Sequence, residues 1–128
     1  MNNTDRNRII AQIESMMNQI WEKLGEGLPL ATYRECLIFE LRSAMLSFRE
    51  NVVIPVTYKY FKPENQLKVD LLIENEIPVE IEMESSEAHR KMMAVLRHSG
   101  KPIGLLITLQ VKPVRFILNK ITYPQKIR

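Results

Sequence analysis

The stretch from residue 77 to residue 109 constrains the fold of this 128-residue chain most strongly. Residues 77–83 have a strand-like composition, and a helix-like stretch follows that Ser85 or Ser86 can cap and that Gly100 can end. Residues 103–109 then form a continuous apolar run, which is typical of a buried central strand. A strand, a helix and a second strand in this order predict a parallel pair joined by a right-handed crossover.

The segments before this unit predict two helices and two further strands. Residues 4–24 place apolar side chains at helical spacing, with Thr4 as the expected N-cap and Gly25 as the stop. Pro29 suits the first turn of a second helix, which extends to about residue 45. Residues 51–61 favour a strand in which Pro55 implies a sheet edge or a bulge, and residues 67–73 favour the next strand.

With a last strand at residues 114–118, the predicted order is α-α-β-β-β-α-β-β. This order predicts one α/β domain, a mixed α+β sheet flanked by helices, over residues 1–121 with a basic tail at 122–128. The single cysteine, Cys36, permits no disulfide within the chain, and the polar first residues lack a signal-peptide pattern. We therefore expect an intracellular protein, cytoplasmic or nuclear, that is not associated with a membrane.

Charge is strongly segregated along the sequence. Residues 64–87 carry one basic and eight acidic groups, whereas residues 88–128 carry nine basic groups and no acidic one. A basic surface of this kind can bind the phosphates of nucleic acid. Alternatively, the two poles neutralise each other within the fold. The candidate phosphate-binding residues are Arg90, Lys91, Arg97, Lys101, Arg115 and Lys120.

Several short segments, taken in order, resemble one protein family. They are EKLGEGL at residues 22–28, Tyr33, ECL at 35–37, VDLLIE at 69–74, PVEI at 78–81 and GLLI at 104–107. This set resembles the GxxExxY proteins, a branch of the PD-(D/E)XK nuclease superfamily. The resemblance extends from about Ile9 to Asn119 and implies a restriction-endonuclease-like core.

The same resemblance implies an active site that is degenerate in this chain. Family members carry a glutamate three residues after Gly27, where this chain has Leu30. Their strand aspartate corresponds to Asp70, and their Glu-x-Lys motif corresponds to Glu80 and Glu82, so a glutamate stands in the place of the lysine. A glutamine on the following helix is replaced by Lys91. The residual or lost catalytic set is therefore Asp70, Glu80, Glu82 and Lys91.

The acidic residues of the third strand leave three alternatives open. Glu80, Glu82 and Glu84 could form an exposed, solubilising strand face; Asp70 and Glu80 could hold magnesium as a residual metal site; or Lys91 could act as a relocated catalytic lysine. Two carboxylates about 5 Å apart repel each other by roughly 3 kcal/mol at an effective dielectric constant of about 20. A metal ion, Lys91 or a proton must offset that repulsion.

Three functions remain at this point. The one that we favour is a catalytically inactive nuclease fold that binds nucleic acid through its basic C-terminal half, with weak sequence preference. The others are a metal-dependent nuclease that uses Lys91, and a structural homodimer without a nucleic-acid role. The methionine pairs at 16–17 and 92–93 are expected to fill core or subunit-interface space, and we expect a homodimer in either case.

Overall fold

The computed structural model describes residues 1–123 and confirms the predicted order of elements. These elements are α1 (Asn3–Leu24), α2 (Leu30–Ser43), β1 (Phe48–Ile54), β2 (Leu67–Ile73), β3 (Ile77–Met83), α3 (Ser86–Ser99), β4 (Gly104–Val111) and β5 (Val114–Ile121). The strands form one five-stranded sheet in the order β1-β2-β3-β4-β5. Only the β3–β4 pair is parallel, as the strand-helix-strand pattern predicts.

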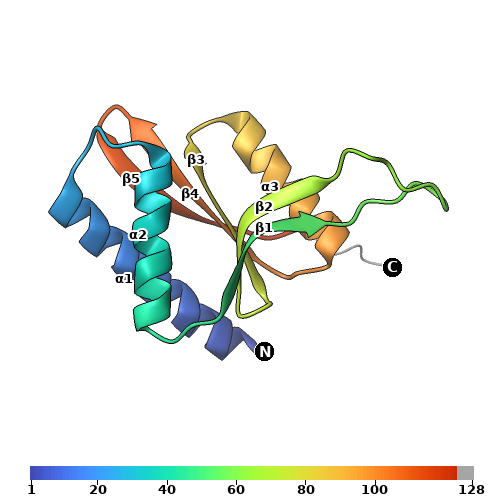
Figure 1. Ribbon diagram of the computed structural model, residues 1–128, viewed down its shortest axis with the longest axis horizontal. Coiled ribbons are helices and arrows are strands. Elements are labelled where there is room, and N and C mark those ends of the chain that lie inside the picture. Colours follow the sequence, from blue (N-terminus) through green and yellow to red (C-terminus); the bar gives the residue numbers. More distant parts are fainter. Residues whose placement is uncertain (124–128) are drawn as a thin grey trace.

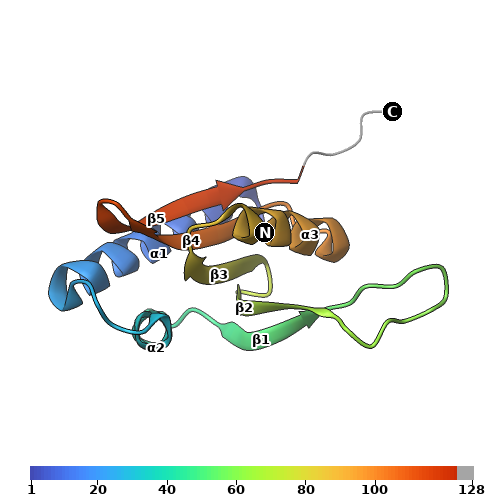
Figure 2. The same ribbon diagram turned by 90° about the horizontal axis from the view of Figure 1, so that it is seen from above.

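The helices cover the sheet in two layers. The larger core cluster joins α1 and α2 to β2, β3 and β4, and the smaller cluster joins α3 to β1 and β2. Figure 1 shows the strands between the α1–α2 pair and α3. Figure 2 shows the same arrangement from above, with the β1–β2 connection extending beyond the rest of the fold. The sheet thus presents one face to α3, and this face carries the candidate site.

Local signals place most of the helix ends. Gly25 follows α1 with φ 70°, Gly100 follows α3 with φ 72°, and Ser85 caps α3 by accepting a hydrogen bond from the Ala88 amide. These three predictions are confirmed. The expectation for Thr4 is wrong, because the side chain of Asn2 caps α1 by accepting from the Asp5 amide at 2.8 Å.

The first strand differs most from its prediction. The prediction covered residues 51–61, whereas β1 spans Phe48–Ile54 and ends just before Pro55. Proline has no amide hydrogen for the ladder, so the strand stops there. Past Pro55 the chain leaves the sheet, and only the isolated bridge between Tyr58 and Phe61 gives it β-structure. The position of β1 at the sheet edge agrees with the expectation from Pro55.

The core explains several single residues. Tyr33 is fully buried and its hydroxyl donates to the Gly25 carbonyl at 2.5 Å, so it anchors the junction of α1 and α2. Met17 and Met92 are also buried in the core. One member of each methionine pair is therefore accounted for without a subunit interface, and the homodimer remains a prediction.

Two sequence predictions concern the ends of the chain and the membrane. Most of the predicted basic tail, residues 124–128, lies outside the described residues. Within residues 1–123, no helix is long and apolar enough to cross a membrane.

Candidate active site

β2 and β3 separate at Asp70 and Glu80, the two acidic residues that match the family motif. Their ladder pairs Leu71, Leu72 and Ile73 with residues of β3 and stops before Asp70. Beyond that point, side chains take over the missing backbone bonds. The Asp70 amide donates to Glu80 Oε1 at 2.7 Å, and the Ile81 amide donates to Asp70 Oδ2 at 2.9 Å. This exchange fixes both carboxylates against the backbone of the neighbouring strand.

On its other edge β2 pairs with β1, and this pair of strands is bent at the same place. Residues two apart in a regular strand share a face, yet Leu71 packs in the α1–α2 cluster and Val69 in the α3 cluster. On β1, Asn51 stands between the partners of these two residues and has a left-handed φ of 50°. The bend at Asp70 and Asn51 thus turns the outer part of the β1–β2 hairpin toward α3.

Glu80 is a buried carboxylate. Its side chain is only 2% exposed, and its Oε2 accepts a hydrogen bond from Lys91 Nζ at 3.1 Å. Burial, together with the nearby charge of Asp70, raises the pKa of Glu80 to about 7, although Lys91 acts in the opposite direction. Because Glu80 is buried, the interpretation of this strand as an exposed, solubilising face is wrong for this residue. Burying a carboxylate in this way costs solvation energy.

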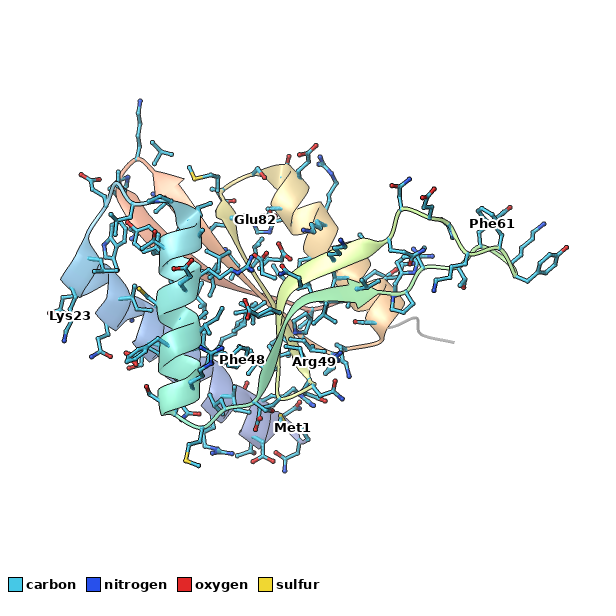
Figure 3. All side chains as sticks on the ribbon, in the orientation of Figure 1. Met1, Lys23, Phe48, Arg49, Phe61 and Glu82 are labelled. Carbon is cyan, nitrogen blue, oxygen red and sulfur yellow. The ribbon has the colours of Figure 1, made fainter. Side chains whose placement is uncertain are left out.

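Lys91 reaches the acidic strand from α3. Val79 and Ile81 pack toward α1 and α2, so the alternate residues Glu80 and Glu82 face α3. Lys91 Nζ lies 3.1 Å from Glu80 Oε2 and 3.6 Å from Glu82 Oε1, and Figure 3 shows Glu82 beside α3. Burial alone would lower the pKa of Lys91, but its acidic neighbours raise it on balance. The structure thus brings the four predicted residues Asp70, Glu80, Glu82 and Lys91 together.

Glu84, the third glutamate of this series, belongs to a separate group. It follows the end of β3, where it accepts a hydrogen bond from Thr108 Oγ1 at 2.7 Å. His89 Nε2 lies 3.2 Å from its other oxygen. Glu84 therefore takes part in contacts between β4 and the first turn of α3.

Arg34 also contacts this site, although the sequence did not single it out. Its Nη1 lies 3.2 Å from Asp70 Oδ1, and its Nη2 lies 3.4 Å from Asn51 Oδ1 and 3.7 Å from Glu50 Oε1. Arg34 comes four residues after Leu30, and residues at this spacing are neighbours on one helix face. That spacing was the available signal. At the position where the resembling family has a glutamate, α2 carries the apolar Leu30, which packs against the core. The cation Arg34 follows one helical turn later.

The comparison with protein families identifies the superfamily of this chain. Residues 7–117 match the family model described as the PD-(D/E)XK nuclease superfamily. The chain belongs to this superfamily. The five-stranded mixed sheet with its flanking helices is consistent with the restriction-endonuclease-like core. The narrower resemblance to the GxxExxY proteins and the degeneracy of the site remain predictions.

Other known proteins add little. No curated protein matches the chain. Among solved structures, the crystal structure of SSO0001 is similar to it, with a TM-score of 0.48 and 13% sequence identity. The alignment covers 86% of this chain and 62% of that chain, so this PD-(D/E)XK protein spans less than two thirds of the other protein's length.

A divalent cation is compatible with the acidic pair of this superfamily member. In residues 1–123, no three histidine, cysteine or acidic side chains are arranged to hold a metal. Magnesium, however, is commonly held by one or two carboxylates, with water and phosphate oxygens completing its shell. Asp70 Oδ2 and Glu80 Oε1 each accept one backbone hydrogen bond, which leaves a second lone pair on each oxygen. Asp70 and Glu80 therefore fit the role of two carboxylate ligands for a divalent cation.

The predicted phosphate-binding residues do not form one cluster. Arg90 and Arg97 are exposed and, being seven residues apart, lie on one face of α3. Lys91 belongs to the acidic site, and Lys101 Nζ donates to the Asn75 carbonyl at 2.9 Å. Two others lie elsewhere. Arg115 lines a surface cavity of about 280 Å³ together with Glu14 and Asn18 of α1, and Lys120 is exposed on the edge strand β5.

Proposed function

We propose that this protein hydrolyses phosphodiester bonds in nucleic acid with the help of a divalent cation, and that Lys91 takes the place of the lysine missing from β3. The position of Lys91 carries the proposal, because its ammonium group lies 3.1 Å from Glu80 and 3.6 Å from Glu82. In this proposal, α3 supplies the cation that is absent at residue 82. Membership in a nuclease superfamily supports the reaction class.

Each residue has a distinct task in this proposal. Asp70 and Glu80 would hold the cation, which when bound would supply Lewis-acid stabilisation of the phosphate. Lys91 carries up to three donors and would stabilise the negative charge that develops on the phosphate oxygens. Glu82 is one-third exposed, so it can accept a proton from an attacking water molecule as a general base.

A second function is favoured by the position of Arg34. Arg34 contacts Asp70 Oδ1 and Lys91 contacts Glu80 Oε2, so that all four oxygens of the two carboxylates accept a hydrogen bond from the protein. Two protein cations can offset the acidic pair without any metal. In that case the protein binds nucleic acid through exposed basic residues of its C-terminal half and does not cleave it.

Cleavage assays separate the two functions. The protein is incubated with single-stranded DNA, duplex DNA and RNA in the presence of magnesium or manganese. We expect cleavage by the wild type, and a decrease in rate of about 100-fold or more for Lys91→Met, since removing one transition-state donor typically costs that much. Asp70→Asn and the partly exposed Glu82→Gln should be similarly impaired. If Lys91→Met does not fold, Glu82→Gln still tests the proposed site.

Lys112→Met is the matched control, because Lys112 is exposed in the turn between β4 and β5. It should cleave like the wild type. Wild-type activity that survives Lys91→Met would contradict the role of Lys91. Binding of nucleic acid without cleavage of any substrate would instead establish the second function.

A further inference from the structure

The connection between β1 and β2 exposes a row of aromatic and basic side chains. Tyr58, Tyr60 and Phe61 are 67%, 100% and 62% exposed, and Lys59 and Lys62 lie among them. We call these five residues, 58–62, the hairpin tip. Figures 1 and 2 both show this connection projecting away from the sheet, and Figure 3 labels Phe61 near its end. Three large aromatic rings in solvent on one short segment indicate a binding surface.

The hairpin tip has a defined conformation. The backbones of Tyr58 and Phe61 exchange two hydrogen bonds of 2.9 Å, which close the turn. Below it, the Gln66 side chain bridges the two arms: it accepts from the Val56 amide at 2.6 Å and donates to the carbonyls of Val56 at 3.1 Å and Pro63 at 2.6 Å. A surface held in place in advance loses less conformational entropy when it binds a ligand.

The chemistry of the hairpin tip matches unpaired nucleic acid. Aromatic faces stack on bases of any sequence, and lysines contact the phosphates between them. In a duplex the base faces are already stacked, so exposed rings favour single-stranded or splayed segments. Lys59 Nζ lies 5.5 Å from the centre of the Tyr58 ring, so a cation and an aromatic ring are neighbours on this segment. Glu64 is the only acidic residue in residues 55–66.

The hairpin tip is also directly connected to the acidic site. β2 begins at Leu67, immediately after Gln66, and Asp70 lies on it. A strand rises about 3.3 Å per residue, so Gln66 is roughly 13 Å from Asp70 along β2. At the base of the hairpin, Val52 and Ile54 pack in the same cluster as Val95 and Leu96 of α3. The tip lies beyond Gln66 in the same hairpin, so an extended strand of several nucleotides is needed to contact both the tip and the site.

We propose that the hairpin tip, Tyr58 to Lys62, binds unpaired bases of single-stranded nucleic acid by stacking and thereby directs the protein to single-stranded substrates. This inference rests on the proposed function, since it specifies the substrate class of that site. It assigns binding to the tip and chemistry to the acidic site, so that the two can be tested separately.

The test compares binding of a fluorescent 20-nucleotide oligo(dT) and of a duplex of equal length, in EDTA so that no cleavage occurs. Stacking is worth about 1–3 kcal/mol per base, so Tyr60→Ala and Phe61→Ala should each weaken oligo(dT) binding by about 5-fold or more. Duplex binding should change by less than about twofold. Tyr60→Phe keeps the ring and should bind like the wild type. Phe39→Ala, which alters an equally exposed aromatic residue on α2, is the matched control and should bind normally.

Normal oligo(dT) binding by the Tyr60→Ala and Phe61→Ala variants would overturn the inference, and so would equal losses of oligo(dT) and duplex binding. Absence of oligo(dT) binding by the wild type would also overturn it. In that case, tip-dependent binding to phosphatidylserine-containing vesicles would identify a membrane surface as the ligand instead. Thermal melts verify the fold of each variant. Tip-dependent binding without cleavage would leave this inference standing and remove the proposed nuclease activity. Lys91-dependent cleavage with normal binding by the tip variants would do the reverse.

Discussion

At the scale of single residues, Glu80 shows how a carboxylate can be buried in this fold. One of its oxygens accepts from the Asp70 amide and the other from Lys91. These contacts do not fully offset the loss of water and the proximity of Asp70, so the pKa of Glu80 is raised to about 7. Its ionisation therefore contributes directly to the pH dependence of folding.

We expect the metal-free protein to lose stability as the pH rises from about 4.5 to 8. The folded pKa of Glu80, about 7, is above the ordinary value of 4.5, so the folded state holds the proton more tightly than the unfolded state. This stabilisation is fully present below the unfolded pKa and is lost as the pH rises through the folded pKa. A difference of this size is worth at most about 3 kcal/mol.

Urea unfolding of wild type and Glu80→Gln at pH 5 and pH 8, in EDTA, measures this contribution. The difference in free energy of unfolding between the two proteins should shift with pH, to the disadvantage of the wild type at pH 8. Glu64→Gln, a change at an exposed acid, should follow the wild type. A difference between wild type and Glu80→Gln that stays constant across this range would show that Glu80 ionises normally.

At the scale of elements, the close approach of α3 to β4 positions Lys91. β4 begins with Gly104, where an added Cβ atom would lie 2.5 Å from Met92 Sδ and 3.3 Å from Leu96 Cδ2. Met92 is fully buried, so an added methyl group would displace its side chain within the core. Met92 directly follows Lys91, so this contact limits how closely α3 approaches β4, the strand next to the acidic strand β3.

We expect Gly104→Ala to destabilise the fold by about 1–3 kcal/mol through overpacking. In a double-mutant cycle with Met92→Ala, the combined loss should be smaller than the sum of the two single losses by about 1 kcal/mol, because the shorter side chain makes room for the methyl group. Chemical denaturation of the four proteins measures this coupling. Strictly additive losses would show that Gly104 and Met92 do not compete for space.

At the scale of the whole molecule, the acidic and basic segments partly neutralise each other. Lys91 pairs with Glu80 and Glu82, and His89 lies against Glu84. Arg90 and Arg97 remain exposed on α3, and Arg97 lies 6.0 Å from the centre of the Tyr123 ring. Neutralisation within the fold, one of the two alternatives from the charge count, is thus realised in part. Phosphate binding by the exposed arginines stays a prediction.

We expect Arg90→Glu combined with Arg97→Glu to weaken duplex binding by a similar factor for all sequences. If each arginine neutralises one phosphate, the log–log slope of affinity against salt should flatten by roughly 1.8, that is about 0.9 for each contact. Anisotropy titrations between about 50 and 200 mM salt measure this slope. Lys112→Glu supplies the control for a change in surface charge, and an unchanged slope in the double variant would exclude this face of α3 from the interface.

The sequence by itself determined the order of elements, the parallel β3–β4 pair and most helix ends, because these depend on local periodicity, capping residues and glycines such as Gly25 and Gly100. Its resemblance to a nuclease family also selected Asp70, Glu80, Glu82 and Lys91. Only the tertiary structure decided that Glu80 is buried and that Arg34 contacts Asp70. It also decided that the outer hairpin leaves the sheet after Ile54. The burial of Glu80 and the contact of Arg34 with Asp70 depend on residues that are distant in sequence. Arg34 and Asp70 are 36 positions apart, and local patterns do not show that two such residues meet.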